Sequence, residues 1–113
     1  MKVKKKIHGW EIDESHPAKA DIIRKALRQV LDPEIKLSII ELGLVRDVSL
    51  KETELHLKMI LTTPFCPYGP VMLEMARTKA EEAAGMQTTI ELGMEAWKQS
   101  MMEDSAASAW GLF

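Results

Sequence analysis

The pattern of apolar and polar positions from residue 54 to residue 61 is that of a strand with one buried face. Every second residue from Leu55 to Leu61 is apolar, and the alternate positions include Glu54, His56 and Lys58. This alternation is typical of a sheet that packs on a core with one face and meets water with the other. Residues 44–50 predict a preceding strand, and because the polar turn at 51–53 is short, we expect an antiparallel hairpin. Residues 87–94 predict a third strand.

Two further segments carry apolar residues at helical spacing. The first opens at Ser15-His16-Pro17 and is expected to end at Asp32-Pro33-Glu34, because the residue before a proline is pushed out of the α region. The second runs from Val71 to Ala84 and stops at Gly85, a good C-cap residue. The residues predicted to face the core are Ala18, Ile22, Ile23, Ala26, Leu27 and Val30 in the first helix, and Met72, Met75, Ala76, Ala80 and Ala83 in the second.

The order helix, strand, strand, helix, strand predicts an α+β fold. We expect a two-layer α/β sandwich with the core order α-β-β-α-β and a small, mainly antiparallel sheet. Residues 100–103 match a capping box, so a short C-terminal helix is predicted to begin at Met101. We interpret residues 1–16 as a partly extended N-terminal extension with Trp10 as an anchor, and residues 17–113 as one domain.

Composition excludes several classes of function. The chain has 113 residues and a formal net charge of -2, so it lacks the excess of positive charge that is typical of a nucleic-acid-binding protein. The basic run at residues 2–6 is better explained as an edge strand with lysines in water than as a binding arm. No apolar stretch suits a signal peptide or a membrane span. The single cysteine excludes an intrachain disulfide and favours a reducing, cytoplasmic location.

That cysteine, Cys66, lies between the end of a predicted strand and the start of a predicted helix. With Pro67 at the first helical position, Cys66 is predicted to be the N-cap. Unpaired N–H groups at a helix N-terminus act as a partial positive charge and lower the pKa of a thiol, which makes it a better nucleophile and metal ligand. The alternative is a small buried side chain with an inert thiol.

Four segments carry a recognisable pattern: Leu31-Asp32-Pro33-Glu34, Ile40-Glu41-Leu42-Gly43-Leu44-Val45, Thr62-Thr63-Pro64-Phe65-Cys66-Pro67, and a C-terminal set of Trp97, Met101, Met102 and Gly111. Together they resemble the PaaD/SufT-type family of iron–sulfur cluster assembly (metal–sulfur cluster biosynthesis) proteins. The resemblance covers about residues 17–113. Two departures are Glu41, where the family usually has aspartate, and Phe65, where glycine is common.

The resemblance implies an assembly protein rather than an enzyme, one that works with iron–sulfur scaffold proteins and client apo-proteins. It implies Cys66 as the candidate cluster ligand. The supporting residues would be Asp32, Glu34, Thr62 and Thr63, and a partner surface would include Trp97, Met101 and Met102.

An iron–sulfur cluster normally takes four thiolate ligands, and this chain offers one. A bound cluster would therefore be labile, shared between the chains of a homodimer or completed by a small thiol, a client, or oxygen or nitrogen ligands. Such ligation suits a transient carrier, whereas an adaptor that docks clients to the scaffold would depend on surface patches instead.

Each of these residues also has a purely structural interpretation. Asp32 and Glu34 suit a turn, Thr62 and Thr63 suit the end of a strand, and the methionines suit core packing. A thiol-dependent enzyme with Cys66 as nucleophile is the alternative function, although no histidine is placed as its base and no second cysteine is present.

Overall fold

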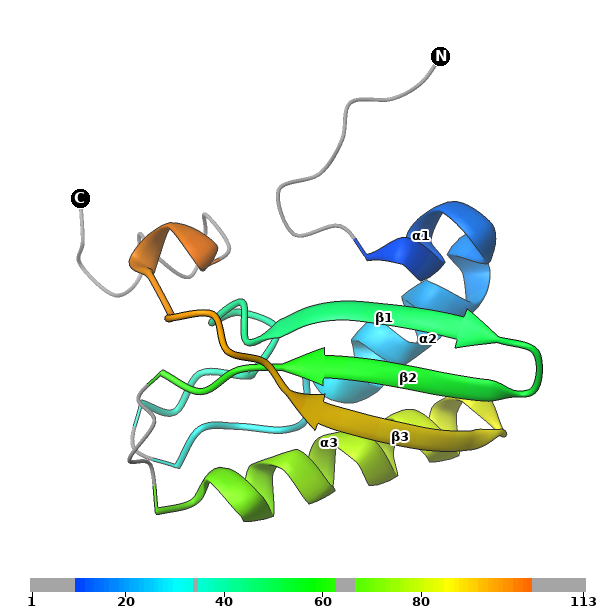
Figure 1. The fold of residues 1–113 in the computed structure, drawn as a ribbon. Helices are drawn as coiled ribbons and strands as arrows, with labels where there is room; N and C mark the ends of the chain where they lie inside the picture. Colours follow the sequence, from blue (N-terminus) through cyan, green and yellow to red (C-terminus); the bar gives the residue numbers. More distant parts are fainter. Residues whose placement is uncertain (1–9, 34, 63–66, 103–113) are drawn as a thin grey trace.

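The computed structural model describes residues 10–33, 35–62 and 67–102. It confirms the predicted α+β class and the core order α-β-β-α-β, with one additional short helix at the front (Figure 1). The elements are α1 (Glu11–Ser15), α2 (Pro17–Leu27), β1 (Val45–Lys51), β2 (Glu54–Met59), α3 (Gly69–Ala84), β3 (Gln87–Leu92) and the 3₁₀ helix η1 (Gln99–Met101).

The sheet has the order β1-β2-β3 and is mixed, where the sequence predicted a mainly antiparallel one. β1 and β2 form the expected antiparallel hairpin, but β3 runs parallel to β2. The reason is that α3 carries the chain back along the sheet, so the next strand starts beside the start of β2. One rung of the sheet joins Val45, Met59 and Leu92 across all three strands.

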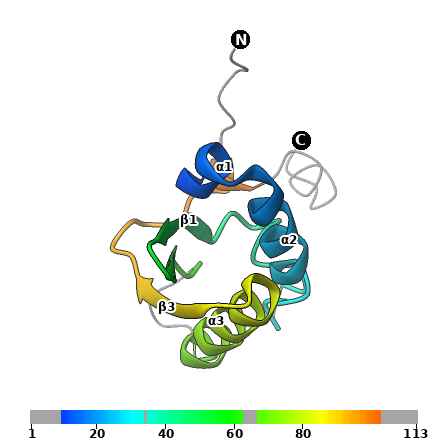
Figure 2. The same ribbon diagram turned by 90° about the vertical axis from the view of Figure 1, so that its right-hand side faces the viewer.

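α2 and α3 pack side by side on one face of this sheet, as Figure 2 shows. The predicted alternation in β2 is confirmed, because Leu55, Leu57 and Met59 are fully buried while His56 is on the other face. The predicted helix faces are only partly correct. Ile22 is 53% exposed and Met75 is 42% exposed, since each lies at the margin of its helix face, beyond the reach of the neighbouring layer.

α1 is helical where the sequence predicted a partly extended segment. The carboxylate of Asp13 accepts a hydrogen bond from the Trp10 N–H at 2.7 Å and so caps this helix. Trp10 is confirmed as an anchor: it is buried, and its indole Nε1 donates to the carbonyl of Val45 at 3.0 Å. The guanidinium of Arg24 lies 3.9 Å from the centre of the indole ring. The division of the chain at residue 16 stays a prediction.

The predicted end of the first helix is wrong. α2 ends at Leu27, because the N–H groups of Gln29 and Val30 turn to the carbonyls of Ala26 and Leu27, three residues back. At the other end of the chain, η1 ends at Met101, where a new helix was expected to begin. The rest of that expected helix lies outside the described residues.

Candidate functional site

A series of backbone hydrogen bonds links residues that lie within or next to three of the four motif segments. The N–H of Ile39 donates to Val30 at 2.9 Å, the N–H of Leu44 donates to Ile39 at 2.9 Å, and the N–H of Ile60 donates to Leu44 at 2.8 Å. All four side chains are buried. The loop after α2, the stretch at residues 40–45 and the end of β2 therefore form one unit, at the end of the molecule where α3 begins (Figure 1).

Asp32 lies in the first of these segments and shapes a tight loop. Its side chain is buried, and Oδ1 accepts a hydrogen bond from the N–H of Ile35 at 3.0 Å. Its main chain is bonded as well, to the carbonyl of Leu37 at 2.9 Å and from the N–H of Lys36 at 2.7 Å. Such a side-chain-to-backbone bond is typical of an aspartate that opens a turn. The structure thus gives Asp32 a loop-shaping role. Glu34 lies outside the described residues.

Glu41 has a structural role that the sequence reasoning missed. Its Oε1 accepts a hydrogen bond from the N–H of Ser38 at 2.8 Å, while Ser38 Oγ accepts one from the N–H of Glu41 at 3.0 Å. These reciprocal bonds form a capping box, and the spacing of Ser38 and Glu41 could have revealed it. The glutamate side chain is longer than that of aspartate by one methylene, and this length lets its carboxylate reach the N–H of Ser38.

The C-terminal motif lies on the same unit. The indole Nε1 of Trp97 donates to the carbonyl of Leu42 at 2.8 Å, and Trp97 stays partly exposed. Met101 and Met102 are buried in the core, which is the packing alternative of the sequence analysis. Of the three residues proposed for a partner surface, only Trp97 is exposed enough to contribute to one. The structure thus joins the C-terminal motif to the stretch at residues 40–45.

The segment that carries Cys66 is only partly described. Thr62 is half-buried after the end of β2, while Thr63 and Cys66 lie outside the described residues. The prediction that Cys66 caps the helix is wrong, because α3 begins at Gly69 with Tyr68 as its N-cap and Pro70 in its first turn. Along the chain, Cys66 therefore precedes the N-cap of α3 by two residues.

His56 is on the polar face of the sheet, away from this unit. Its Nδ1 lies 2.8 Å from Thr89 Oγ1, and its Nε2 lies 2.7 Å from Glu91 Oε1. It is thus held by cross-strand hydrogen bonds. Within the described ranges, no cluster of three or more His, Cys, Asp or Glu side chains is arranged to hold a metal ion. No helix in the same ranges is long and apolar enough to cross a membrane.

Comparison with known proteins gives one family and several relatives. The profile of a family described as iron–sulfur cluster assembly protein matches residues 20–108. An Fe-S protein maturation auxiliary factor of Porphyromonas gingivalis is 36% identical over 89 residues, which cover 76% of this chain and 84% of that protein. Another such factor, from Bacillus subtilis, is 45% identical over 53 residues, or 46% of this chain and 52% of that protein.

The fold has relatives among solved structures as well. A domain of unknown function from Bacillus anthracis superposes with a TM-score of 0.77, and the match covers 88% of this chain and 98% of that domain. At 23% identity, this likeness concerns the fold.

Proposed function

Because this chain belongs to the iron–sulfur cluster assembly protein family, we propose that it is a maturation factor that receives a cluster at Cys66 and passes it to client apo-proteins. The relatives are named as maturation factors rather than as enzymes, and the chain is an assembly protein of that kind. Its partners in this proposal are an iron–sulfur scaffold and the clients. A reducing cytoplasm, where thiols stay free, is the compartment that suits this chemistry.

The observation that carries the proposal is the series of backbone hydrogen bonds from Val30 through Ile39 and Leu44 to Ile60. It ties the loop of Asp32 to the end of β2, from which the chain continues toward Cys66. A loop that starts from a rigid base positions a reactive group better than a free loop would. The burial and bonding of Asp32 support the same conclusion, because they fix the shape of the neighbouring loop.

The cluster is cargo in this proposal. One thiolate from Cys66 leaves most of the ligand positions of an iron–sulfur cluster to other donors. A second copy of the chain, a small thiol or a client can supply them, and Asp32, Glu34, Thr62 and Thr63 are the residues of this chain proposed to support the site. Incomplete ligation by one protein lets client thiolates replace Cys66 step by step, which is what transfer requires.

The test is anaerobic reconstitution with iron, sulfide and glutathione, for the wild-type chain and the Cys66→Ser variant in parallel. Visible absorbance, iron and sulfide content and molar mass in solution are measured together. The carrier proposal expects cluster absorbance that depends on Cys66, with a dimeric mass if two chains share the cluster. Equal absorbance for both proteins, or none for either, would overturn the carrier role and leave the adaptor role.

The alternative of a thiol-dependent enzyme gains no support from the described residues. His56, the one histidine within the sheet, is engaged with Thr89 and Glu91 on the polar face. A nucleophilic cysteine is activated by an adjacent base or by another group that lowers its pKa, and His56 is not available as that base. Iron binding without turnover of acyl or disulfide substrates would separate the carrier from such an enzyme.

A further inference from the structure

The methionines of this chain differ widely in their exposure to solvent. The chain has eight of them, and all but Met1 lie within the described residues. Met94 is 96% exposed, Met75 is 42% exposed, and Met86 is partly buried. The buried methionines, each at most 8% exposed, are Met59, Met72, Met101 and Met102. A reagent in solution therefore reaches Met94 far more readily than the methionines of the core.

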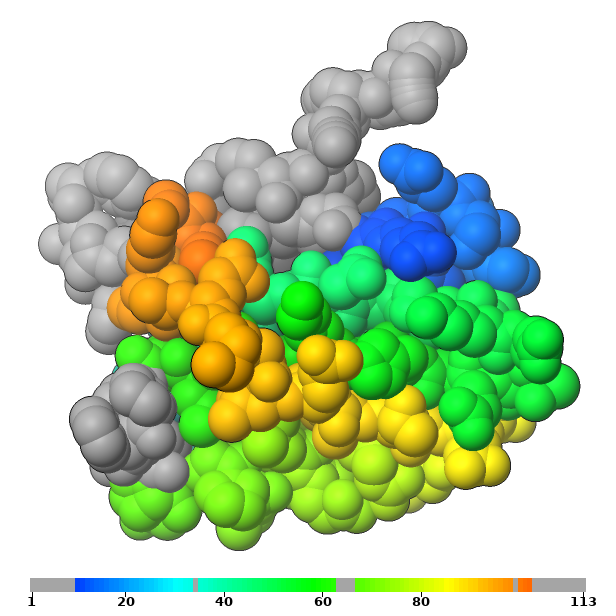
Figure 3. Space-filling view, in the orientation of Figure 1, coloured from blue at the N-terminus to red at the C-terminus, as the bar shows by residue number. Residues whose placement is uncertain are grey.

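The backbone on both sides of Met94 is held in place. The N–H of Gly93 donates to the carbonyl of Met59 at 2.7 Å and so continues the pairing of β3 with β2. On the other side, the carboxylate of Glu95 forms an ion pair with Arg46 at 3.3 Å. Figure 3 shows the segment after β3, coloured orange, on the surface of the molecule. The exposure of Met94 thus belongs to the folded state and does not require local unfolding.

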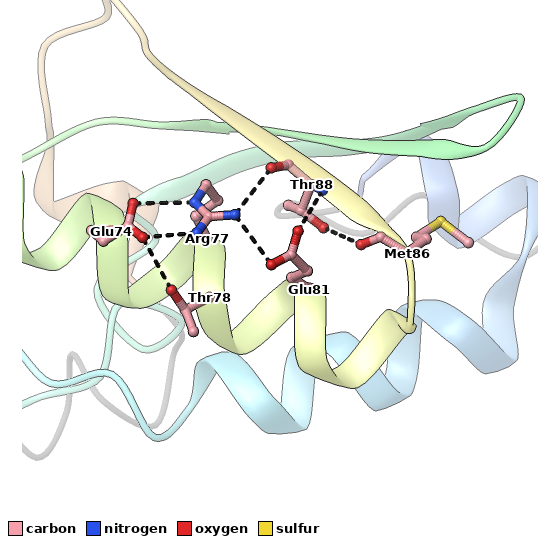
Figure 4. A network of polar contacts seen from close by, with 6 residues as sticks. All are labelled: Glu74, Arg77, Thr78, Glu81, Met86 and Thr88. Carbon is pink, nitrogen blue, oxygen red and sulfur yellow. Dashed lines mark hydrogen bonds and ion pairs between the residues drawn. The ribbon is translucent and has the colours of Figure 1, made fainter.

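Met86, at the other end of β3, is an internal comparison. Its carbonyl accepts a hydrogen bond from the Thr88 hydroxyl at 3.0 Å, next to the ion pair of Arg77 with Glu81 at the end of α3 (Figure 4). Its side chain packs against the hydrophobic core. Met86 and Met94 therefore flank the same strand in opposite environments.

The two environments respond differently to oxidation of the thioether. Oxidation adds one oxygen atom to the sulfur and makes an apolar side chain polar. In the core, at Met72 or Met101, this would bury a polar group among apolar side chains, which is unfavourable. At Met94 the side chain is in water before and after the reaction. Oxidation at Met94 is therefore compatible with the folded state.

We propose that Met94 is a reversible oxidation site of this protein, with a peroxide as the oxidant. The sulfur lone pair attacks one oxygen of hydrogen peroxide, the O–O bond breaks, and the other oxygen leaves as water. The sulfur loses two electrons and becomes a sulfoxide. A methionine sulfoxide reductase reverses the step: two thiols become a disulfide, and the sulfoxide oxygen leaves as water. The reaction requires neither a cluster nor Cys66.

Dilute hydrogen peroxide, applied to the folded full-length chain, tests this proposal. Trypsin leaves Met86 and Met94 in one peptide, residues 80–98, so tandem mass spectrometry compares the two sites within one molecule. We expect Met94 to react within about twofold of its rate in the urea-unfolded chain, because the peroxide reaches its sulfur without any opening of the structure. Met86 should react at least about fivefold more slowly than Met94.

The buried methionines set the other limit. Met59, Met72, Met101 and Met102 react only when the structure opens, so folding should slow them at least about a hundredfold. Equal rates for Met94 and Met101 in the folded chain would overturn the proposal. A Met94 rate that rises strongly on unfolding would also overturn it.

Variants locate the reaction. Met94→Leu should remove the fast phase of oxygen uptake by the folded chain. Met75→Leu is the matched control, because Met75 is the next most exposed methionine of the described residues, and it should leave the fast phase unchanged. A fast phase that survives in Met94→Leu would overturn the assignment.

Reversibility has its own measurement. A chain oxidised at Met94 should keep its urea midpoint, and methionine sulfoxide reductases of both stereospecificities, supplied with dithiothreitol, should restore its original mass while it is folded. A lowered midpoint, or reduction that occurs only in the unfolded chain, would overturn the reversible site.

The thiol of Cys66 also reacts with peroxide, and the Cys66→Ser chain separates the two reactions. We expect the same Met94 rate in both chains. A slower Met94 in Cys66→Ser would mean that the oxidant acts through the thiol, which would overturn direct oxidation. Loss of the proposed cluster function leaves the Met94 rate unaffected, so the two proposals fail separately.

Discussion

The backbone of Gly43 lies directly against the carbonyl of Met101. A Cβ on Gly43 would stand 1.9 Å from that oxygen, far inside van der Waals contact, and the residue has φ +73°. The contact joins the stretch at residues 40–45 to the C-terminal segment, next to the hydrogen bond from Trp97 to Leu42. Two motifs that are distant along the chain thus meet at a position where only glycine fits.

Gly43→Ala is expected to lower the free energy of unfolding by about 3 kcal/mol, the sum of the left-handed backbone cost and the overpacking cost. Gly85→Ala is the matched control, because Gly85 has φ +69° but nothing within 4 Å of its Cβ position. It should cost about 1 kcal/mol. Urea unfolding of both variants measures the difference. Equal losses would mean that the C-terminal segment moves aside without cost.

Asp32→Ala is expected to lower the free energy of unfolding by about 2 kcal/mol, because the N–H of Ile35 loses its partner in a buried loop. Asp32→Asn keeps an oxygen acceptor and should cost less than about 1 kcal/mol. Urea unfolding checks both values. If Asn is as damaging as Ala, the charge of Asp32 rather than its hydrogen bond holds the loop. If the Asp32→Asn variant is instead stable, it can be used to test whether the carboxylate of Asp32 contributes to cluster binding.

The stability of the chain should fall in acid partly through Glu74. The hydrogen bond from Arg77 lowers the pKa of Glu74 below its ordinary value of 4.5, aided by the charge of Arg77, and the same bond raises the pKa of Arg77. A lowered carboxyl pKa contributes stability that is present above the ordinary value and is lost as the pH falls through the folded-state pKa.

Glu74→Gln should therefore flatten the pH dependence of the unfolding free energy below 4.5. Denaturant unfolding across the acid range measures it. Glu82→Gln is the control, since Glu82 is exposed and has no hydrogen bond or ion pair within the described part of the chain. Identical acid profiles for the wild type and Glu74→Gln would show that the ion pair of Glu74 with Arg77 does not contribute to the free energy of unfolding in solution.

Arg77→Met should promote association through β3. Without the guanidinium, the carbonyl of Thr88 on the outer edge of β3 loses its cap. Within the described residues, the outward backbone groups of Ile90 and Leu92 have no hydrogen-bond partner, so the unpaired part of the edge lengthens. We expect a rise in mass with concentration in analytical ultracentrifugation. Lys79→Met removes a cation of the same helix that contacts Gln29 instead, and should leave the mass unchanged. A monomeric Arg77→Met chain would show that the cap does not protect the edge.

Sequence periodicity predicted the strands and helices well because each has one buried face. The prediction was wrong at the margins of the buried helix faces. Ile22 and Met75 have helical spacing but are exposed, because spacing does not show how far the neighbouring layer extends. It also failed at the start of α3, where two prolines, Pro67 and Pro70, both suit a first turn and the structure uses the second. The direction of β3 depends on the crossover by α3, which the spacing of apolar residues does not encode.

The sequence by itself determined the fold class, the order of the core elements and the family, because these depend on side-chain type and spacing. Only the tertiary structure decided how the motifs meet. The bonds from Val30 through Ile39 and Leu44 to Ile60 join backbone groups, which are the same in every residue and leave no trace in side-chain patterns. The half-closed edge of β3 was decided in the same way, because it depends on where α3 places Arg77 against Thr88.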